Sequence, residues 1–91
     1  MNALVTGASS GIGLQYSREL ASRGYDVVMV SNQEVEIKQC AEDIAKEFGV
    51  KTYPIFKDLT DIEAPYQLLD YCKENNLDIE VLVNNAGVFL F

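Results

Sequence analysis

The sequence contains no histidine and only two cysteines. Without histidine, neither a Ser-His-Asp triad nor a histidine-ligated zinc site can form within this chain. The two cysteines, Cys40 and Cys72, do not stand in a metal-binding spacing, and we expect no metal site. Both occupy apolar positions of helical patterns, so we expect buried or half-buried thiols rather than a disulfide. A reducing, cytoplasmic location fits this cysteine usage.

Positive charge is scarce as well. Seven Lys and Arg residues stand against fourteen Asp and Glu residues, which gives a net charge of −7. The excess acid lies in the later helices and loops, where we interpret it as solvated surface. Such a surface repels DNA, RNA and anionic membranes, so we expect none of them as a partner. No apolar run approaches the length of a membrane span, and no signal peptide precedes the first expected strand.

Length and composition set the scale of the fold. The 91 residues make at most one domain, and an apolar content of 48% is typical of a globular protein. This length allows a modest core but is small for a doubly wound sheet, which usually has two halves. We therefore expect residues 1–91 to form one half-domain of such a sheet.

The most informative pattern lies in residues 1–24. A short apolar strand runs into Thr6-Gly7-Ala8-Ser9-Ser10-Gly11-Ile12-Gly13, and a helix follows. Gly7 can take a positive φ, Gly11 leaves room for a pyrophosphate, and Gly13 lets the first helical turn pack closely on the sheet. Because the first N–H groups of a helix lack intrahelical partners, the pattern predicts an anion site. The alternative is a tight strand–helix turn that binds nothing.

Periodicity predicts alternating strands and helices along the chain. Unbroken apolar runs indicate buried strands, and apolar residues spaced by three and four indicate helices. Strands are expected at residues 2–6, Val27–Val30, Lys51–Phe56 and Val81–Val83, and helices at Gly11–Arg23, Glu34–Phe48 and Ala64–Asn75. We expect the first two helices to end at Gly24 and Gly49, Pro65 to lie in the first turn of the third, and Pro54 to mark an edge strand.

Each expected helix has an apolar face for the sheet. The second helix has the clearest single stripe. The inward residues are expected to be Ile12, Tyr16, Leu20 and Ala21 in the first helix, Ile37, Cys40, Ala41, Ile44, Ala45 and Phe48 in the second, and Leu68, Leu69 and Cys72 in the third.

The order βαβαβαβ implies right-handed crossovers and a parallel sheet. If the fourth strand returns beside the first, the strand order is 3-2-1-4, and the third helix covers the face opposite the first two. The expected fold class is therefore α/β, a three-layer Rossmann-type sheet. Ligands would bind at the C-terminal ends of strands one and four, the topological switch point.

Three short elements fall at that edge of the sheet. Thr6-Gly7-x-x-x-Gly11-x-Gly13 follows strand one, Asp58-Leu59 follows strand three, and Asn84-Asn85-Ala86-Gly87 follows strand four. In this order and at these strand ends, the combination resembles the short-chain dehydrogenase/reductase family over essentially the whole chain. The resemblance implies the N-terminal, NAD(P)-binding Rossmann half of an oxidoreductase that transfers hydride to or from a carbonyl or alcohol.

The resemblance also implies roles for individual residues. The turn from Gly7 to Gly13 would hold the adenosine ribose and the pyrophosphate, with Ser9 and Ile12 among the contacts. The complete set of expected cofactor-binding residues is Gly7, Ser9, Ser10, Gly11, Ile12, Gly13, Ser31, Asn32, Asp58, Leu59, Asn84, Ala86 and Gly87.

At the other two elements, Asp58 would accept a hydrogen bond from the adenine amino group, and the Leu59 backbone would lie alongside the ring. Asn84, Ala86 and Gly87 would line the adenosine ribose and nicotinamide side. The asparagine pair would also tie the fourth strand to its neighbours. The alternatives are that Asp58 only caps the following turn and that the asparagines are purely structural.

Cofactor choice depends on the end of strand two. An acidic residue there would bind the 2′-hydroxyl of NAD, and a basic one there, or just before the second glycine, would hold the phosphate of NADP. These positions are Ser31, Asn32, Gln33 and Ser10, so neither signal is present. The missing carboxylate removes the group that repels a 2′-phosphate, and Ser31 and Asn32 could hydrogen-bond to one. This favours NADP, with NAD as the alternative.

The family's catalytic serine and Tyr-x-x-x-Lys pair lie on later elements, which we expect beyond residue 91. One Tyr-x-x-x-Lys does occur, from Tyr53 to Lys57. It falls on an expected strand, where four steps separate the residues by roughly 13 Å, rather than on one helix face. We therefore expect no catalytic residue in the chain, no turnover by it alone, and a larger protein of which it is the N-terminal part.

Two further expectations concern partners and competing functions. We expect a dimer or higher homo-oligomer, either through the unpaired edge of the fourth strand with the apolar segment Val88–Phe91 or by exchange of elements. The alternative function is a non-catalytic NAD(P)-sensing module. A signalling receiver is disfavoured because Thr6-Gly7 stands where its acidic cluster would be, and a P-loop NTPase because no lysine follows a glycine in the turn.

Overall fold

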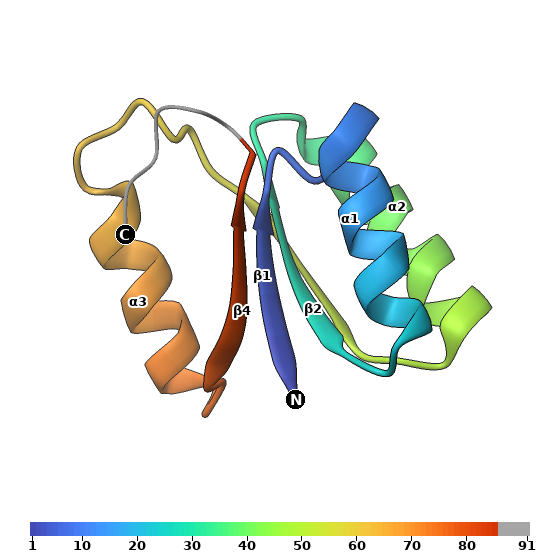
Figure 1. The fold of residues 1–91 in the computed structure, drawn as a ribbon. Coiled ribbons are helices and arrows are strands. Elements are labelled where there is room, and N and C mark those ends of the chain that lie inside the picture. Colours follow the sequence, from blue (N-terminus) through green and yellow to red (C-terminus); the bar gives the residue numbers. More distant parts are fainter. Residues whose placement is uncertain (86–91) are drawn as a thin grey trace.

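A computed structural model describes residues 1–85 of the chain and shows the alternating α/β order that the sequence predicts (Figure 1). Every element begins and ends within two residues of its expected position. The elements are β1 (Asn2–Thr6), α1 (Gly11–Ser22), β2 (Asp26–Ser31), α2 (Glu34–Phe48), β3 (Thr52–Phe56), α3 (Ala64–Glu74) and β4 (Ile79–Asn84).

The four strands form one parallel sheet in the order β3-β2-β1-β4, as predicted. Helices α1 and α2 cover one face, and α3 covers the other (Figure 1). The central strands β1 and β2 are therefore buried on both faces, which explains their unbroken apolar runs. Pro54 lies in β3 at an edge of the sheet, where a missing N–H costs little.

Two cores fill the layers. Between the sheet and α1 and α2, the fully buried Val5 and Met29 meet Ile37 and Ile44 of the α2 stripe. Between the sheet and α3, the second core contains Leu4, Val28, Val30, Ala64, Leu68 and Cys72. The stripe predicted for α2 is confirmed, and the helix ends at Gly49 with φ +68°.

The face predicted for α1 is partly wrong. Ile12 and Tyr16 are 66% and 48% exposed, whereas Gly13, Ser17 and Ala21 are the buried positions. These three lie one turn apart, and their small side chains let the helix approach the sheet closely. The hydroxyl of Ser17 is satisfied within the helix, since it donates to the carbonyl of Gly13 at 3.0 Å. A rule that assigns the larger apolar residues to the core therefore selects the wrong face here.

In α3 the prediction holds for Leu68 and Cys72 but not for Leu69, which is 45% exposed. Leu68 and Cys72 are one helical turn apart, and Leu69 is rotated about 100° from Leu68, toward the side of β4. Both cysteines are free thiols, Cys72 buried and Cys40 half-buried, as expected. Burial raises the pKa of the Cys72 thiol.

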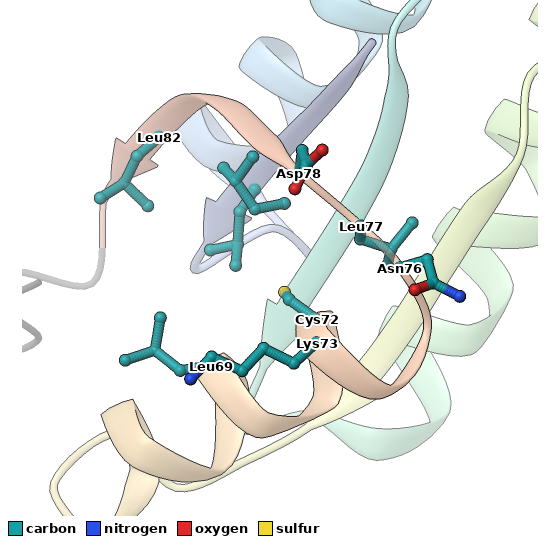
Figure 2. Close-up of a pocket in the computed structure, with 9 residues that line it drawn as sticks. Leu69, Cys72, Lys73, Asn76, Leu77, Asp78 and Leu82 are labelled. Carbon is teal, nitrogen blue, oxygen red and sulfur yellow. The ribbon is translucent and has the colours of Figure 1, made fainter.

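Strand β4 forms the second edge of the sheet. Its register against β1 shifts between Asn2 and Ala3, so that Glu80 is an extra residue in the ladder. Beside β4, an open groove of about 570 Å³ runs between this strand and α3, with Leu69 and Leu82 on its two sides (Figure 2). In residues 1–85, none of the helices has the length and apolar character needed to cross a membrane.

Candidate dinucleotide-binding site

Strands β1 and β4 are adjacent and end at the same edge of the sheet, where the glycine-rich turn leads from β1 into α1 (Figure 1). The strand order changes direction at β1, because β2 and β3 lie on one side of it and β4 lies on the other. Open α/β sheets bind ligands at such a switch point, outside the carboxyl ends of the strands.

Each glycine of the turn is needed for a different structural reason. Gly7 and Gly11 have φ of +63° and +55°, a region that side chains disfavour. A Cβ on Gly11 would meet no protein atom within 4 Å, so this position faces open space at the start of α1. A Cβ on Gly13 would lie 2.0 Å from the carbonyl oxygen of Gly7. Gly13 is thus required for packing, and Gly11 keeps the open space accessible.

Helix α1 begins without a side-chain cap. Ser10 is the N-cap residue with extended backbone, and its hydroxyl makes no capping hydrogen bond within residues 1–85. The first turn also contains no acidic residue. The N–H groups at this helix start therefore remain available to an anion, and the helix dipole adds partial positive charge. These features fit the pyrophosphate of a dinucleotide.

The ends of β1 and β4 are joined through the buried hydroxyl of Thr6. Its Oγ1 donates to Oδ1 of Asn84 at 3.1 Å and accepts from the backbone N–H of Asn85 at 3.0 Å. Nδ2 of Asn85 reaches the carbonyl oxygen of Gly7 at 3.5 Å. The predicted tie between the asparagine pair and the neighbouring strand is confirmed, and it fixes the glycine-rich turn from the β4 side.

On the β2 side, the turn is held by Ser9. Its Oγ donates to Oε1 of Gln33 at 2.6 Å and lies 2.8 Å from Oγ of Ser31. The backbone N–H of Ala8 also donates to the carbonyl of Val30 at 3.0 Å. Ser31 is only 3% exposed, so its hydroxyl faces this network rather than the open edge. Of the predicted residues at the end of β2, Asn32 is the exposed one.

Asp58 follows β3 and caps the turn after it. One oxygen, Oδ1, accepts from the Thr60 hydroxyl at 2.6 Å and from the Thr60 N–H at 3.0 Å. These bonds, the hydroxyl first, lower the pKa of the Asp58 carboxyl. The capping interpretation thus describes Asp58 in this structure, and the carboxylate remains an acceptor. The side chain of Leu59 packs against the core beneath α3.

The remaining expected residues divide into two groups. Ser10 and Ile12 are exposed at the start of α1, beside Gly11 and Gly13. Ala86, Gly87 and the segment Val88–Phe91 lie outside the described residues. The structure therefore brings Gly7, Ser9, Ser10, Gly11, Ile12, Gly13, Ser31, Asn32 and Asn84 to one edge of the sheet, with Asp58 and Leu59 following β3 at the same edge.

The Tyr53 to Lys57 pair is not arranged for catalysis. Tyr53 lies within β3, and Nζ of Lys57 donates to Oε1 of Gln67 at 2.6 Å. No group of three or more Asp, Glu or Cys residues in the described range is placed to hold a metal ion. The groove between α3 and β4 is also separate from the site, since Asn76, Leu77 and Asp78 line it at the opposite end of β4 (Figure 2).

Sequence reasoning did not predict two interactions of the site. The Thr6 hydroxyl and the Gln33 carboxamide both hold the glycine-rich turn, yet neither was among the expected site residues. Thr6 belongs to the turn motif, so a polar side chain ending an apolar strand was an available signal. Gln33 and Ser9 are 24 residues apart, and nothing in the spacing indicates that they meet.

Comparison with known proteins identifies the family. The short chain dehydrogenase family model matches residues 1–90. The chain belongs to the short-chain dehydrogenase family. It is 41% identical over 86 residues to the very-long-chain 3-oxoacyl-CoA reductase of Anas platyrhynchos, covering 94% of this chain and 27% of that protein. It is 38% identical over 87 residues to the human inactive hydroxysteroid dehydrogenase-like protein 1, covering 96% of this chain and 26% of that protein.

Among solved structures, L-sorbose reductase from Gluconobacter frateurii, complexed with NADPH and L-sorbose, superposes with a TM-score of 0.89. The identity is 30%, and the match covers 94% of this chain and 33% of that one. This short-chain dehydrogenase sequence thus spans about a quarter of the length of the curated relatives described above.

Proposed function

We propose that this chain forms the dinucleotide-binding, N-terminal part of an NAD(P)-dependent short-chain oxidoreductase that acts on a carbonyl or alcohol substrate. The 91 residues by themselves bind the cofactor but do not turn over substrate, because the serine and the helical Tyr-x-x-x-Lys pair of the family are not among them. The observation that carries the proposal is the uncapped start of α1, which faces open space at Gly11 and follows β1 at the switch point of the sheet.

When bound, the nicotinamide cofactor supplies the hydride that such an enzyme transfers. The residues of this chain position it. The N–H groups at the start of α1 donate to the pyrophosphate, and Gly11 lets the phosphates approach the backbone. Ser10 and Ile12 border that approach. Asn84 lines the ribose and nicotinamide side, and the family resemblance implies the same role for Ala86 and Gly87, which lie outside the described residues.

At the adenine end, we propose that Asp58 accepts from the adenine amino group. Its Oδ1 is engaged by Thr60, so Oδ2 is the oxygen that would receive this bond. The backbone of Leu59 lies alongside the ring in this arrangement, since its side chain is turned into the core.

We propose NADP rather than NAD as the cofactor. No carboxylate follows β2 before α2 begins, so the group that would repel a 2′-phosphate is missing. L-sorbose reductase, the neighbour with a TM-score of 0.89, is complexed with NADPH, which supports the same choice. Asn32 is exposed and Ser31 is buried, which supports Asn32 as the residue of the predicted pair that would meet the phosphate.

A second candidate is a non-catalytic NAD(P)-binding module. It is favoured by the 38% identity to a human relative whose name calls it inactive. Both candidates use the same site in residues 1–85. Assay of the protein in its natural full length separates them, because a binding module would hold cofactor without reducing any carbonyl compound.

The test of the proposed function is calorimetric titration of the purified chain with NADPH and NADH, combined with Gly11→Ala. The new methyl group meets no protein atom within 4 Å but occupies the space through which the pyrophosphate approaches. We expect cofactor binding to wild type and a loss of at least about tenfold in affinity in the variant, which is about 1.4 kcal/mol.

The matched control is Gly49→Ala at the end of α2. Gly49 has φ +68°, close to the +55° of Gly11, and a Cβ there also meets open space. Both variants therefore introduce the same kind of backbone strain, of about 1–2 kcal/mol. Equal loss of cofactor affinity in both variants, or no binding by wild type, would contradict the proposal. NADPH reduction of carbonyl compounds by the 91-residue chain would contradict the expected inactivity.

A further inference from the structure

Three hydrogen bonds close a ring between the glycine-rich turn and the β2–α2 connection. The backbone N–H of Gln33 donates to Oγ of Ser31 at 3.0 Å. Oγ of Ser31 lies 2.8 Å from Oγ of Ser9, and Oγ of Ser9 donates to Oε1 of Gln33 at 2.6 Å. The ring thus begins and ends at Gln33, the N-cap residue of α2, whose side chain makes no capping bond within the described residues.

Proton counting fixes the direction of each bond. A hydroxyl has one proton, and a carboxamide oxygen can only accept. The Ser9 hydroxyl donates its one proton to Oε1 of Gln33, so Ser31 must be the donor in the bond between the two hydroxyls. Oγ of Ser31 receives the Gln33 N–H in turn. Each member of the ring donates once and accepts once, and neither serine has a proton left for a ligand.

The ring of hydrogen bonds is attached to the sheet through Ser31. Ser31 is the last residue of β2, 3% exposed, and its carbonyl accepts from the N–H of Lys57 at 2.9 Å. Next to the ring, the N–H of Ala8 donates to the carbonyl of Val30 at 3.0 Å. A turn residue bonded to such an anchor takes one fixed position, and the ring therefore sets where the chain runs between Gly7 and Gly11.

We propose that Gln33 is a positioning and specificity-determining residue of the dinucleotide site. Through Oε1 it holds Ser9, and with it the glycine-rich turn, in the shape that receives the pyrophosphate. Its Nε2 group donates to the 2′-substituent of the cofactor. The Nε2 protons are the only side-chain protons of Ser9, Ser31 and Gln33 that do not take part in the ring. This inference rests on the proposed function.

Two observations support the second role. Within residues 1–85, Nε2 of Gln33 donates to no protein group, and the residue is exposed. No lysine or arginine occurs between Arg23 and Lys38, while Glu34 and Glu36 follow in the first turn of α2. Within the β2–α2 connection itself, a 2′-phosphate would therefore meet only neutral donors, and its affinity depends on how many of them remain.

Two variants of Gln33 separate the roles. Gln33→Met keeps the length of the side chain but removes both the acceptor and the donor, so it opens the ring. We expect affinity for NADPH and for NADH to fall together, by roughly three- to tenfold. Gln33→Glu keeps an acceptor for Ser9 and so keeps the ring, but it replaces the donor with a negative charge. We expect NADH affinity within about threefold of wild type and NADPH affinity reduced on the order of tenfold or more.

Ser9→Ala opens the same ring from its other side. It should match the common loss of affinity in Gln33→Met, and the double variant should lose little more, because residues of one network are not additive. Gln39→Glu is the charge control, since it introduces the same charge farther along α2 on an exposed face, where the Gln39 amide bonds to Asp43 at 2.9 Å and not to the ring. Amide hydrogen exchange of Ala8 without cofactor reports the ring itself, and we expect faster exchange in Gln33→Met and Ser9→Ala only.

The outcomes are distinguishable from failure of the proposed function. If wild type binds both cofactors but Gln33→Glu leaves their affinity ratio unchanged, or Gln39→Glu changes it equally, the inference is overturned and the proposed function stands. If Gln33→Met changes neither affinity nor exchange of Ala8, the positioning role is overturned. Absence of binding by wild type overturns the proposed function and this inference with it.

Discussion

The first turn of α1 crosses the chain leaving β1 so closely that a Cβ on Gly13 would lie 2.0 Å from the carbonyl oxygen of Gly7. The contact is with backbone, which cannot rotate away, and Nδ2 of Asn85 lies 2.9 Å from the same point. Because Gly13 has no side chain, α1 can lie directly against the backbone of the turn and against the Asn85 side chain after β4.

We predict that Gly13→Ala destabilises the chain by about 3 kcal/mol or more, because the backbone of the turn must shift to admit the methyl group. Urea unfolding followed by circular dichroism measures this. Gly24→Ala is the control: it also adds a methyl group at an end of α1, where φ is +90° and no atom lies within 4 Å. That variant should lose only about 1–2 kcal/mol from backbone strain. Equal losses would contradict close packing as the reason for glycine at this position.

A second prediction concerns the Thr6 hydroxyl. Thr6→Val keeps the shape of the side chain but leaves the N–H of Asn85 without its acceptor and Oδ1 of Asn84 without its donor. We expect a loss of about 1–3 kcal/mol in the free energy of unfolding, the cost of unmade bonds at a part-buried site. Thr60→Val, at an exposed turn, should cost less. If the two cost the same, Thr6 is not the tie between β1 and β4.

A third prediction is the pH dependence of Asp58. Because the Thr60 hydroxyl and N–H lower its pKa in the folded chain, the contribution of these bonds is fully present above the unfolded pKa of about 3.9 and is lost as the pH falls through the folded pKa. NMR titration of the carboxyl carbon should give a midpoint below that of an unperturbed aspartate. Thr60→Val should move it upward and Thr60→Ser should not. A midpoint unaffected by Thr60→Val would show that another group lowers it.

The sequence predicted α2 to the residue, and the reason is physical. Its apolar residues form one stripe, and the buried residues of the helix, Ile37, Ala41 and Ile44, all lie on that stripe. In α1 the same reasoning was right for Leu20 and Ala21 but wrong for Ile12 and Tyr16, because Gly13 and Ser17 are the other buried positions. A helix can approach a sheet closely only where its side chains are small. A prediction based on hydrophobicity does not place such small residues in the core.

In the candidate site, too, some features could be predicted from the sequence and others could not. The glycine spacing predicted the turn, because φ and close contact act on single residues and leave a local signal. The hydrogen bonds of the Ser31 hydroxyl could not be predicted from the sequence, since they depend on Ser9 and Gln33 from two other segments. Side-chain hydrogen bonds between distant segments depend on rotamers that only the packed structure fixes.

The edge formed by β4 and the groove beside it leads to a last expectation. Leu82 of β4 and Leu69 of α3 are 41% and 45% exposed and lie on the two sides of the groove. A strand edge next to an apolar groove offers a partner backbone hydrogen bonds and apolar contact together. The bulge at Glu80 limits regular pairing to the residues after it, Val81 to Asn84.

We therefore predict that the 91-residue chain associates with a second copy of itself through Val81–Asn84 and the groove, so that its sedimentation coefficient rises with concentration. Leu82→Lys should shift the equilibrium to monomer, because the charge would be buried against the partner's apolar surface. Ile62→Lys is the control, since Ile62 is 82% exposed in the turn before α3 and does not line the groove. A monomer at all concentrations, or equal dissociation by both variants, would contradict this interface.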